Sequence, residues 1–299
     1  MIDQASGLRS LLERGSAEAR FGRVDAIAVA SGKGGVGKTV VAANLAVLAA
    51  RAGRRVLLID GDLGLANVDV VLGVHCRHTI GDVLRGSVPL STALVRGPGG
   101  VCVLAAGSGA EWLAHLDAGG LAVLQDELAG LGNAFDLIVV DCAAGIGRNV
   151  LFFARVTGRV LVTLTPEPTA LADAYALLKA LAADGTVDAH VVVNQALSST
   201  DARDAFGRLR AVSERFLATE PAYVGHVPRD DDVRRSVRAR QPVVTFSAGS
   251  RAASALDGVF RALLATRATP APRARASIGG MAVDDAGGAR AAAPVAEAP

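Results

Sequence analysis

A glycine-rich stretch at residues 31–39 constrains the fold of this chain more than any other feature of its sequence. It reads Ser-Gly-Lys-Gly-Gly-Val-Gly-Lys-Thr, follows an apolar run at residues 26–30 and opens a helical pattern at residues 39–51. This order of strand, loop and helix fits the pattern G-x-x-x-x-G-K-[ST], in which backbone N–H groups surround a polyphosphate. Glycines allow the close approach, and the helix N-terminus adds partial positive charge. We therefore expect a phosphate-binding loop; the alternative is a glycine-rich turn without a ligand.

The side chains of this loop indicate how a nucleotide and a metal ion would be held. Lys38 would reach the β- and γ-phosphates, and the Thr39 hydroxyl would ligate Mg²⁺. Lys33 is unusual, because a second lysine inside the loop is not needed to hold phosphate within one chain; the alternative is a solvated loop lysine. The residues expected to contact the nucleotide here are Gly34, Gly35, Val36, Gly37, Lys38, Thr39 and Val40.

The sequence around this loop predicts a single α/β domain over residues 22–268. Short runs rich in Val, Leu and Ile alternate with helical patterns, and runs that are apolar on both faces suit a parallel sheet covered by helices on both sides. We expect a doubly wound, mostly parallel sheet whose ligands bind at the carboxyl ends of the strands. The predicted strands are 26–30, 55–60, 101–105, 137–141, 160–164, 189–193 and 223–226, and the predicted helices are 39–51, 121–131, 171–182 and 202–216.

Two further segments flank this domain. Residues 1–21 are short and charged, with leucines at helical spacing. Residues 269–299 consist mainly of Ala, Pro, Gly and Arg, with almost no large hydrophobic side chains. A tail of this composition cannot bury enough apolar surface to offset its ordering entropy, so we expect it to be disordered.

Three aspartates end apolar strands where the phosphates are expected. Asp60 and Asp62 follow the run at residues 57–59, and Asp141 follows the run at residues 137–140. Asp141 would bind Mg²⁺ through water, and Asp60 would support the metal or the geometry of the adjoining loop. Each acid taken alone could instead cap a helix or form a turn.

Composition narrows the classes of function. The chain has 299 residues, 51% of them hydrophobic, but no uninterrupted apolar run of the ~18 residues that a membrane span needs. Charged residues interrupt the N-terminal region, so no signal peptide is predicted, and three scattered cysteines fit a reducing compartment. A net charge of +2 demands neither nucleic acid nor an anionic membrane. We expect a cytoplasmic protein.

Metal chemistry other than Mg²⁺ has little support in the sequence. The stretch His75-Cys76-Arg77-His78 places three possible ligands together, but no second cluster completes a tetrahedral zinc site. We expect an ordinary loop there. The sequence contains no C-x-x-C pair, which argues against an iron–sulfur carrier.

The segment Lys-Gly-Gly-Val-Gly-Lys-Thr at residues 33–39 resembles the deviant Walker A motif of the MinD/ParA ATPases without a mismatch. The resemblance implies ATP as the nucleotide and a dimer in which Lys33 reaches the partner's nucleotide. There the lysine would stabilise negative charge in the transition state, like an arginine finger. Asp62 resembles the aspartate that orients or activates the attacking water in this class. The implied catalytic residues are Lys33, Lys38 and Asp62.

Further stretches resemble the FlhG (FleN, YlxH) branch of the MinD-like ATPases. They comprise residues 60–69, 72–73, 79–84, 165–169, 173–179, 191–194 and 225–230, and the match runs from about residue 26 to 244. The resemblance implies that Asn194 reads adenine and that Pro228 lies in a loop closing over the base. It also implies control of flagellar number or placement by a homodimer.

The N-terminus adds to this resemblance. Asp3, Gln4, Leu8 and Arg9 fit the segment D-Q-A-x-x-L-R, which in the family docks on the GTPase FlhF and stimulates GTP hydrolysis. Gln4 could help to position a water in the partner's site; the alternative is a frayed terminal helix. The other implied partners are flagellar basal-body (C-ring) proteins and a flagellar transcription activator, and no specific nucleic acid is expected.

Several alternatives stay open at this point. Cys142-Ala143 stands where the family usually has Thr-Gly, so a nucleotide-binding adaptor with little turnover is one alternative. Division-site selection of the MinD type, or DNA partition of the ParA type, is another. The basic cluster that would serve DNA consists of Arg229, Arg234, Arg235, Arg238 and Arg240. An apolar stripe on the helix expected at residues 250–267 suits either packing on the domain or reversible contact with the inner face of the cell membrane.

Overall fold

The computed structural model describes residues 24–64, 67–107, 111–131, 134–183, 188–217, 220–266 and 284–285. The predictions for residues 1–21, including the roles of Asp3, Gln4, Leu8 and Arg9, lie outside these ranges. The predicted disordered tail lies outside them too, apart from residues 284–285.

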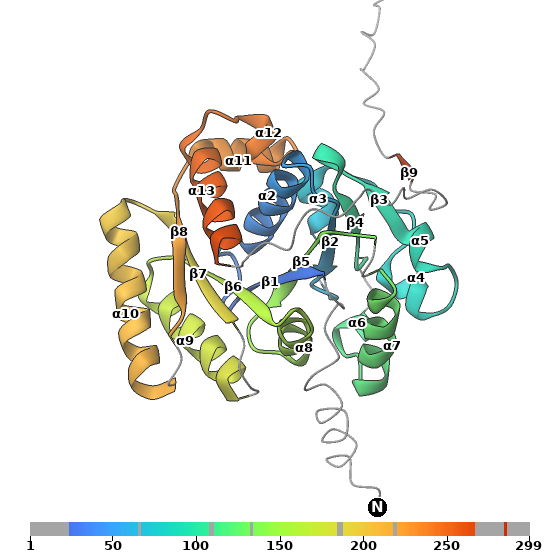
Figure 1. The fold of residues 1–299 in the computed structure, drawn as a ribbon, viewed down its shortest axis with the longest axis horizontal. Coiled ribbons are helices and arrows are strands. Elements are labelled where there is room, and N and C mark those ends of the chain that lie inside the picture. The colour runs from blue at the N-terminus through green and yellow to red at the C-terminus, as the bar shows by residue number, and fades with distance from the viewer. Residues whose placement is uncertain are drawn as a thin grey trace, which may run out of the picture.

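A twisted, mostly parallel sheet forms the centre of the molecule (Figure 1). Its strand order is β8-β7-β6-β1-β5-β2-β4-β3-β9, and β3 and β4 are the antiparallel pair. The strands are β1 (Asp25–Ser31), β2 (Val56–Gly61), β3 (Leu94–Arg96), β4 (Cys102–Leu104), β5 (Leu137–Ala144), β6 (Arg159–Leu164), β7 (Asp188–Ala196), β8 (Ala222–Pro228) and the two-residue β9 (Asp284–Asp285). Strand β1 lies between β5 and β6, which puts the loop that follows it in the middle of the sheet's carboxyl edge.

Helices cover both faces of this sheet, as the sequence predicts (Figure 1). The helices are α2 (Lys38–Arg51), α3 (Val68–Leu72), α4 (Ile80–Leu84), α5 (Leu90–Ala93), α6 (Glu111–Ala114), α7 (Ala118–Ala129), α8 (Arg148–Thr157), α9 (Pro168–Ala183), α10 (Ser199–Leu217), α11 (Asp231–Arg238), α12 (Val243–Phe246) and α13 (Arg251–Ala265). A short 3₁₀ turn, η1, spans Pro98–Gly100.

The core consists of two apolar layers separated by the sheet. Ala28 of β1 belongs to the layer that packs against α7, α8, α9 and α10, whereas its neighbour Val29 belongs to the layer that packs against α2, α3, α12 and α13. Successive side chains of a strand point to opposite faces, so a strand apolar at every position serves both layers. The doubly wound single domain is therefore confirmed.

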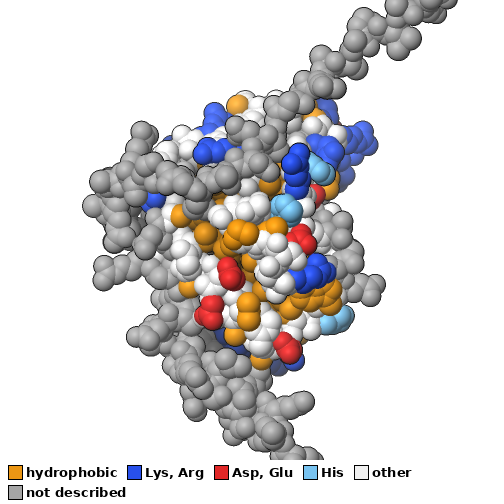
Figure 2. All heavy atoms as spheres, turned by 90° about the vertical axis from the view of Figure 1, so that its right-hand side faces the viewer, with side chains coloured by type: hydrophobic (Ala, Val, Ile, Leu, Met, Phe, Trp, Pro, Cys, Tyr) orange, Lys and Arg blue, Asp and Glu red, His pale blue; other side chains and the backbone are white. Residues whose placement is uncertain are grey.

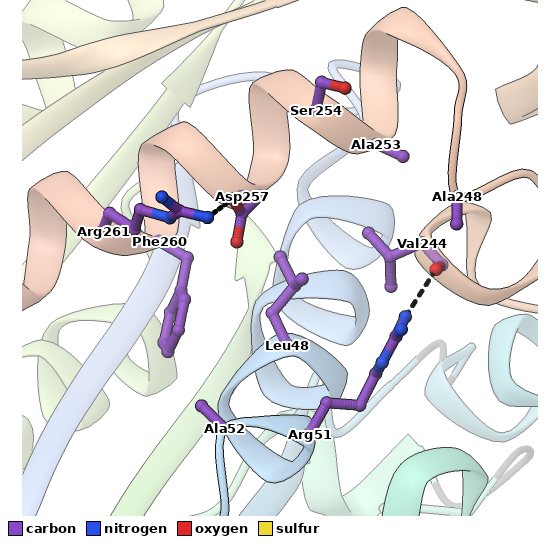
Figure 3. Close-up of a pocket in the computed structure, with 10 residues that line it drawn as sticks. All are labelled: Leu48, Arg51, Ala52, Val244, Ala248, Ala253, Ser254, Asp257, Phe260 and Arg261. Carbon is purple, nitrogen blue, oxygen red and sulfur yellow. Dashed lines mark hydrogen bonds and ion pairs between the residues drawn. The ribbon is translucent and has the colours of Figure 1, made fainter.

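Helix α13 lies along α2 on one face of the sheet (Figure 3). Its apolar residues Leu256, Val259, Phe260 and Leu263 are buried. The structure thus supports packing on the domain for this stripe. A shallow groove of about 600 Å³ runs between the two helices, where Arg51 donates a hydrogen bond of 2.8 Å to the Val244 carbonyl. Among the described residues, no helix is long and apolar enough to cross a membrane.

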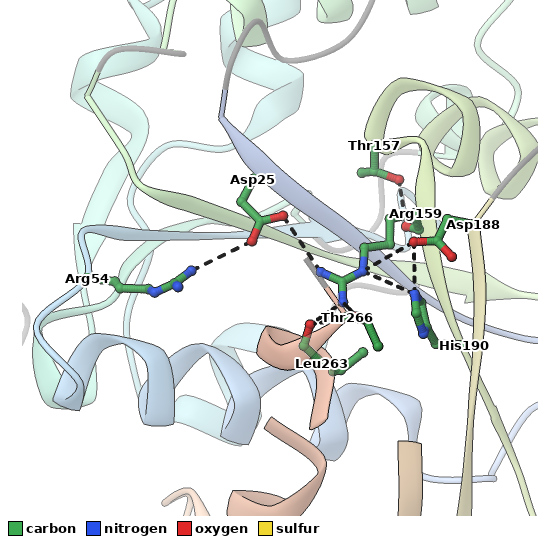
Figure 4. Close-up of polar contacts among 8 residues, drawn as sticks. All are labelled: Asp25, Arg54, Thr157, Arg159, Asp188, His190, Leu263 and Thr266. Carbon is green, nitrogen blue, oxygen red and sulfur yellow. Dashed lines mark hydrogen bonds and ion pairs between the residues drawn. The ribbon is translucent and has the colours of Figure 1, made fainter. Parts of the chain in front are cut away.

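A buried arginine ties the end of α13 to the amino edge of the sheet (Figure 4). Arg159 of β6 donates hydrogen bonds to the Leu263 carbonyl and the Thr266 hydroxyl, which close the last turn of α13. Its guanidinium also lies 3.8 Å from Asp25 of β1 and from Asp188 of β7. A buried cation needs such partners, because removing them from a buried ion pair lowers the stability of the fold by about 3–5 kcal/mol.

Candidate nucleotide-binding site

The glycine-rich loop at residues 31–39 lies at the carboxyl end of β1 and leads into the N-terminus of α2. Gly35 and Gly37 have φ angles of +82° and +88°, in the left-handed region that favours glycine. Gly37 is the N-cap of α2 and supplies no side chain to accept the first helical N–H groups. Those groups remain donors for an anion, so the loop has the geometry of a phosphate cradle.

Lys38 and Asp141 form a buried ion pair beneath this loop. The Lys38 Nζ atom lies 3.0 Å from Asp141 Oδ1, and both side chains are almost fully buried. Burial lowers the pKa of Lys38, but the adjacent Asp141 outweighs it and the net pKa is raised. Lys38 is therefore held as a cation beside the loop, and a phosphate group could compete for it.

The residues around Asp141 fit a magnesium ion. The Thr39 hydroxyl donates a hydrogen bond to the Asp141 carboxylate, so the two predicted metal-binding groups are already adjacent. A hydroxyl and a carboxylate are hard oxygen ligands, and Mg²⁺ is usually held by one or two such groups together with waters and phosphates. The donor set therefore fits the predicted metal, with Thr39 and Asp141 as the candidate ligands.

Asp60 organises the loop that follows β2. It lies opposite Asp141 in the register of β2 and β5 and is fully buried. Its Oδ1 accepts the Asp62 N–H at 3.1 Å, and its Oδ2 accepts the N–H groups of Asn67 and Val68 at 2.9 and 3.1 Å. Burial and the Asp141 charge raise the pKa of Asp60 to about 8. Of the two roles predicted for Asp60, metal ligand and support of the loop, this geometry favours the second.

Asp62 begins this loop close to the phosphate cradle. Its negative charge is the smallest of the causes that raise the pKa of Lys38. The hydrogen bond from the Asp62 N–H to the Asp60 carboxylate fixes the position of the Asp62 backbone. The structure thus joins Lys38 and Asp141 in an ion pair, and Asp62 begins the loop that follows β2.

Lys33 has a different environment from Lys38. Its side chain is 41% exposed, and its Nζ atom lies 3.0 Å from Thr169 Oγ1 and 3.4 Å from Glu167 Oε2, both near the start of α9. Sequence reasoning gave no role to Glu167 or Thr169, although both lie within the stretch 165–169 that resembles the family. The sequence gives no direct signal for this contact, because it depends on the packing of α9 beside the loop.

Asn194 lies near the carboxyl end of β7, and Pro228 ends the neighbouring strand β8. Asn194 is buried, pairs with Val227 in the sheet register, and donates a hydrogen bond of 2.7 Å to the Val36 carbonyl. The next residue, Gln195, donates to the Gly35 carbonyl at 3.3 Å and has a φ of +58°. Sequence reasoning missed Gln195, because positive φ at a residue other than glycine leaves no mark in a sequence.

The segment after β5 meets the start of the phosphate loop. The Gly145 N–H donates a hydrogen bond of 2.8 Å to the Ser31 carbonyl, and Gly145 has a φ of +95°. Ile146 follows with half of its surface exposed, at 52%. Cys142, which departs from the family pattern, is completely buried, and burial raises the pKa of its thiol.

Comparison with known proteins agrees with this geometry. The sequence model of the CobQ/CobB/MinD/ParA nucleotide-binding domain matches residues 27–243. The chain is 43% identical to the antiactivator FleN of Pseudomonas aeruginosa, over 79% of this chain and 85% of that protein. It is 33% identical to the flagellum site-determining protein YlxH of Helicobacter pylori, over 81% and 83% of the two chains.

A solved structure shows the same fold with a nucleotide bound. The septum site-determining protein MinD of Pyrococcus horikoshii, complexed with Mg-ADP, superposes with a TM-score of 0.69 at 26% identity, covering 80% of this chain and 96% of that one. The fold and the site therefore define an ATP hydrolase of the MinD/ParA class, a class whose members bind nucleotide and Mg²⁺. Within that class, the chain belongs to the FlhG (FleN, YlxH) family.

Proposed function

We propose that this chain is an ATP-switched homodimer that controls the number or placement of flagella. The observation that carries the proposal is the contrast between two lysines of one loop. Lys38 is buried against Asp141 inside its own chain's site, whereas Lys33 is exposed at the rim. Exposure of this cation at the edge of the phosphate cradle supports the proposal that it completes the site of a second copy.

Dimer formation would require the Lys33 side chain to break its contacts with Glu167 and Thr169 of its own chain. Its partners Glu167 and Thr169 are accessible to solvent, and Glu167 is 66% exposed. Exposed ion pairs contribute on the order of 0–1 kcal/mol, because water and salt screen them. The contact is therefore weak enough for triphosphate charge on a partner chain to displace it.

The remaining residues take defined roles in this scheme. Bound Mg-ATP would supply the triphosphate whose terminal bond is hydrolysed. Lys38 would bind the β- and γ-phosphates, and Thr39 and Asp141 would hold the metal. Asp62 would position the attacking water, with Asp60 fixing its loop. Because ATP and ADP must stabilise different states for a switch to signal, the γ-phosphate contacts of Lys33 would decide the state.

The flagellar assignment comes from the relatives. FleN is named an antiactivator and YlxH a flagellum site-determining protein. These names support a flagellar role for this chain. The partners that we propose are the ones the FlhG resemblance implies: an FlhF-like GTPase, C-ring proteins and a flagellar transcription activator. The N-terminal residues Asp3, Gln4, Leu8 and Arg9 would stimulate that GTPase. The protein would act in the cytoplasm, and contact of α13 with the inner face of the cell membrane would require this helix to leave the domain.

The alternative of DNA partition has less support. Figure 2 shows Lys and Arg side chains in separate groups on the upper part of one face of the molecule, some of them beside His side chains. Two arginines of the predicted basic cluster are paired on their own helix, Arg234 with Asp231 and Arg235 with Asp232. Pairing of this kind reduces the charge available to phosphates.

Flagellar counts in cells test the assignment. A deletion strain of the source organism is complemented with wild type, with Lys38→Ala and with an N-terminal truncation that removes residues 1–10. We expect wild type alone to restore the normal number and position of flagella, because the two variants lack nucleotide binding and GTPase stimulation respectively. A deletion that changes the division site but leaves flagella unchanged would contradict the proposal.

A further inference from the structure

The carboxyl end of β7 contains an irregularity at the phosphate loop. Asn194 pairs with Val227 of β8 and Ala196 pairs with Pro228, so Gln195 is an extra residue in the register between them. Gln195 adopts a φ of +58°, which is uncommon outside glycine and costs on the order of 1 kcal/mol. Bulges of this kind are frequent beside active sites, where they redirect side chains.

The bulge lets two consecutive side chains reach the same loop. In a regular strand, neighbouring side chains point to opposite faces. Here the Asn194 amide donates to the Val36 carbonyl at 2.7 Å, and the Gln195 amide donates to the Gly35 carbonyl at 3.3 Å. The approach is close: a Cβ added to Gly37 would lie 2.3 Å from Asn194 Nδ2.

These two hydrogen bonds fix the orientation of two peptide groups. In a trans peptide, the C=O and the N–H of the same group point in opposite directions. Holding the Gly35 carbonyl therefore directs the Val36 N–H away from Gln195, and holding the Val36 carbonyl directs the Gly37 N–H away from Asn194. Both N–H groups belong to the loop that would surround the phosphates.

We propose that Asn194 and Gln195 are positioning residues that preset the phosphate loop for a polyphosphate before it binds. The proposal rests on the proposed function only in that this site binds ATP. It gives Asn194 a second role besides the predicted reading of adenine. It also assigns a role to the strained backbone of Gln195, which aims both amides at the loop. A loop ordered in advance loses less entropy when the ligand binds.

Inorganic triphosphate separates the two roles of this site, because it has phosphates and no base. Calorimetric titrations with Mg²⁺ compare ATP and inorganic triphosphate on the full chain. Gln195→Met keeps the length of the side chain without its donor, and Gln195→Glu places a carboxylate oxygen against the Gly35 carbonyl. Asn194→Ser removes the other amide. Gln241→Met, on an exposed glutamine after α11, is the matched control.

We expect Gln195→Met to weaken the binding of both ligands by about threefold to tenfold, since one hydrogen bond is lost. Asn194→Ser should weaken the binding of inorganic triphosphate by a similar factor and that of ATP by more, because the predicted reading of adenine is lost as well. Gln195→Glu should weaken both by more than tenfold, and Gln241→Met should change neither. In steady-state assays the KM for ATP should rise in the Gln195 variants, with kcat retained at saturating ATP. The melting temperature of the nucleotide-free Gln195 variants should stay close to that of wild type, because the side chain is exposed.

Three results would overturn the proposal. One is unchanged affinity for both ligands in the two Gln195 variants. Another is a loss confined to ATP, which would mean that these amides act on the base. The third is a wild type that binds ATP but not inorganic triphosphate, which would mean that the loop alone contributes little. A wild type that binds neither ligand would instead refute the nucleotide-binding function itself.

Discussion

At the scale of single residues, the site is governed by charges buried close together. Lys38, Asp141 and Asp60 are all buried at the carboxyl edge of β1, β2 and β5, where an unpaired charge is costly. Lys38 compensates Asp141 directly, and three backbone N–H groups support Asp60. This arrangement makes the nucleotide-free chain sensitive to pH.

The pH dependence can be stated with its sign. The pKa of Asp60 is raised from its ordinary value of 3.8 to about 8, first by burial and then by Asp141. The folded chain thus keeps a proton that the unfolded chain releases, so the stability from this site is greatest below about pH 4 and is lost as pH rises toward about 8. We expect the melting temperature of the nucleotide-free wild type to fall across this range.

Asp60→Asn tests this expectation, because an amide does not titrate. Its melting temperature should be lower than that of wild type at acidic pH, since two N–H groups lose their acceptor, and it should fall less steeply as pH rises. Scanning fluorimetry between about pH 4.5 and 8.5, without nucleotide or Mg²⁺, measures both slopes. Parallel curves for the two proteins would show that Asp60 does not titrate in this window.

A second prediction concerns the contact that holds Lys33. Glu167→Gln removes the charge opposite Lys33 without changing the shape of the side chain. Because exposed pairs are weak, we expect the ATP concentration for half-maximal dimerisation to fall only about twofold to fivefold. Analytical ultracentrifugation across an ATP series measures it. A rise in that concentration would indicate that Glu167 supports the dimer, which contradicts its role as a contact of the single chain.

At the scale of elements, helix α13 decides between two interpretations of one apolar stripe. Leu256 and Phe260 are buried against the sheet and α2, and Arg159 fastens the last turn of the helix. The stripe is therefore part of the core in the described fold. Contact of this stripe with a membrane would first require the helix to leave the domain.

Leu256→Ala measures how much this packing contributes. Because Leu256 is 1% exposed, the substitution should lower the free energy of unfolding by about 2–5 kcal/mol. Arg261→Ala, on the exposed side of the same helix, should change it by less than about 0.5 kcal/mol. Urea unfolding followed by circular dichroism gives both values. An unchanged midpoint for Leu256→Ala would mean that the helix is not packed in solution.

The sequence predicted the central elements better than the peripheral ones, for physical reasons. The strands that became β1, β2, β5, β6 and β7 are apolar on both faces, which is a strong pattern. Strand β3 was missed because it has only three residues, pairs antiparallel with β4 near the end of the sheet and follows a short helix. Helix α8 was not predicted, because Arg148 and Asn149 interrupt the apolar pattern in its first turn.

The residues of the site were also predicted unevenly: those at the ends of central strands were found, and contacts that depend on packing were not. Motif spacing placed Lys38, Thr39 and Asp141 together, because the strand order of this fold brings those strand ends to one edge. The contacts of Lys33 with Glu167 and of Gln195 with Gly35 were not predicted. They depend on helix packing and on a strand bulge, which a sequence pattern does not encode.

At the scale of the whole molecule, the two faces of the sheet stabilise the fold, and the carboxyl edge carries the candidate site. The faces are filled by the two apolar layers that hold the domain together. The carboxyl edge carries the phosphate loop at residues 31–39, the loop that begins at Asp62 and the exposed Ile146. The Lys33 ammonium group lies at its rim. In our proposal this edge meets the same edge of a second chain when ATP is bound, and the partner's Lys33 adds the charge that one chain lacks.

Light scattering after size exclusion tests this central claim most directly. Wild type, Asp62→Ala and Lys33→Ala are each run without nucleotide, with ADP and with ATP, all with Mg²⁺. We predict a wild-type dimer only with ATP, a stable ATP dimer for Asp62→Ala because hydrolysis no longer resets it, and a monomer in every condition for Lys33→Ala. A wild type and an Asp62→Ala variant that both stay monomeric with ATP, or a Lys33→Ala variant that dimerises as well as wild type, would contradict the account.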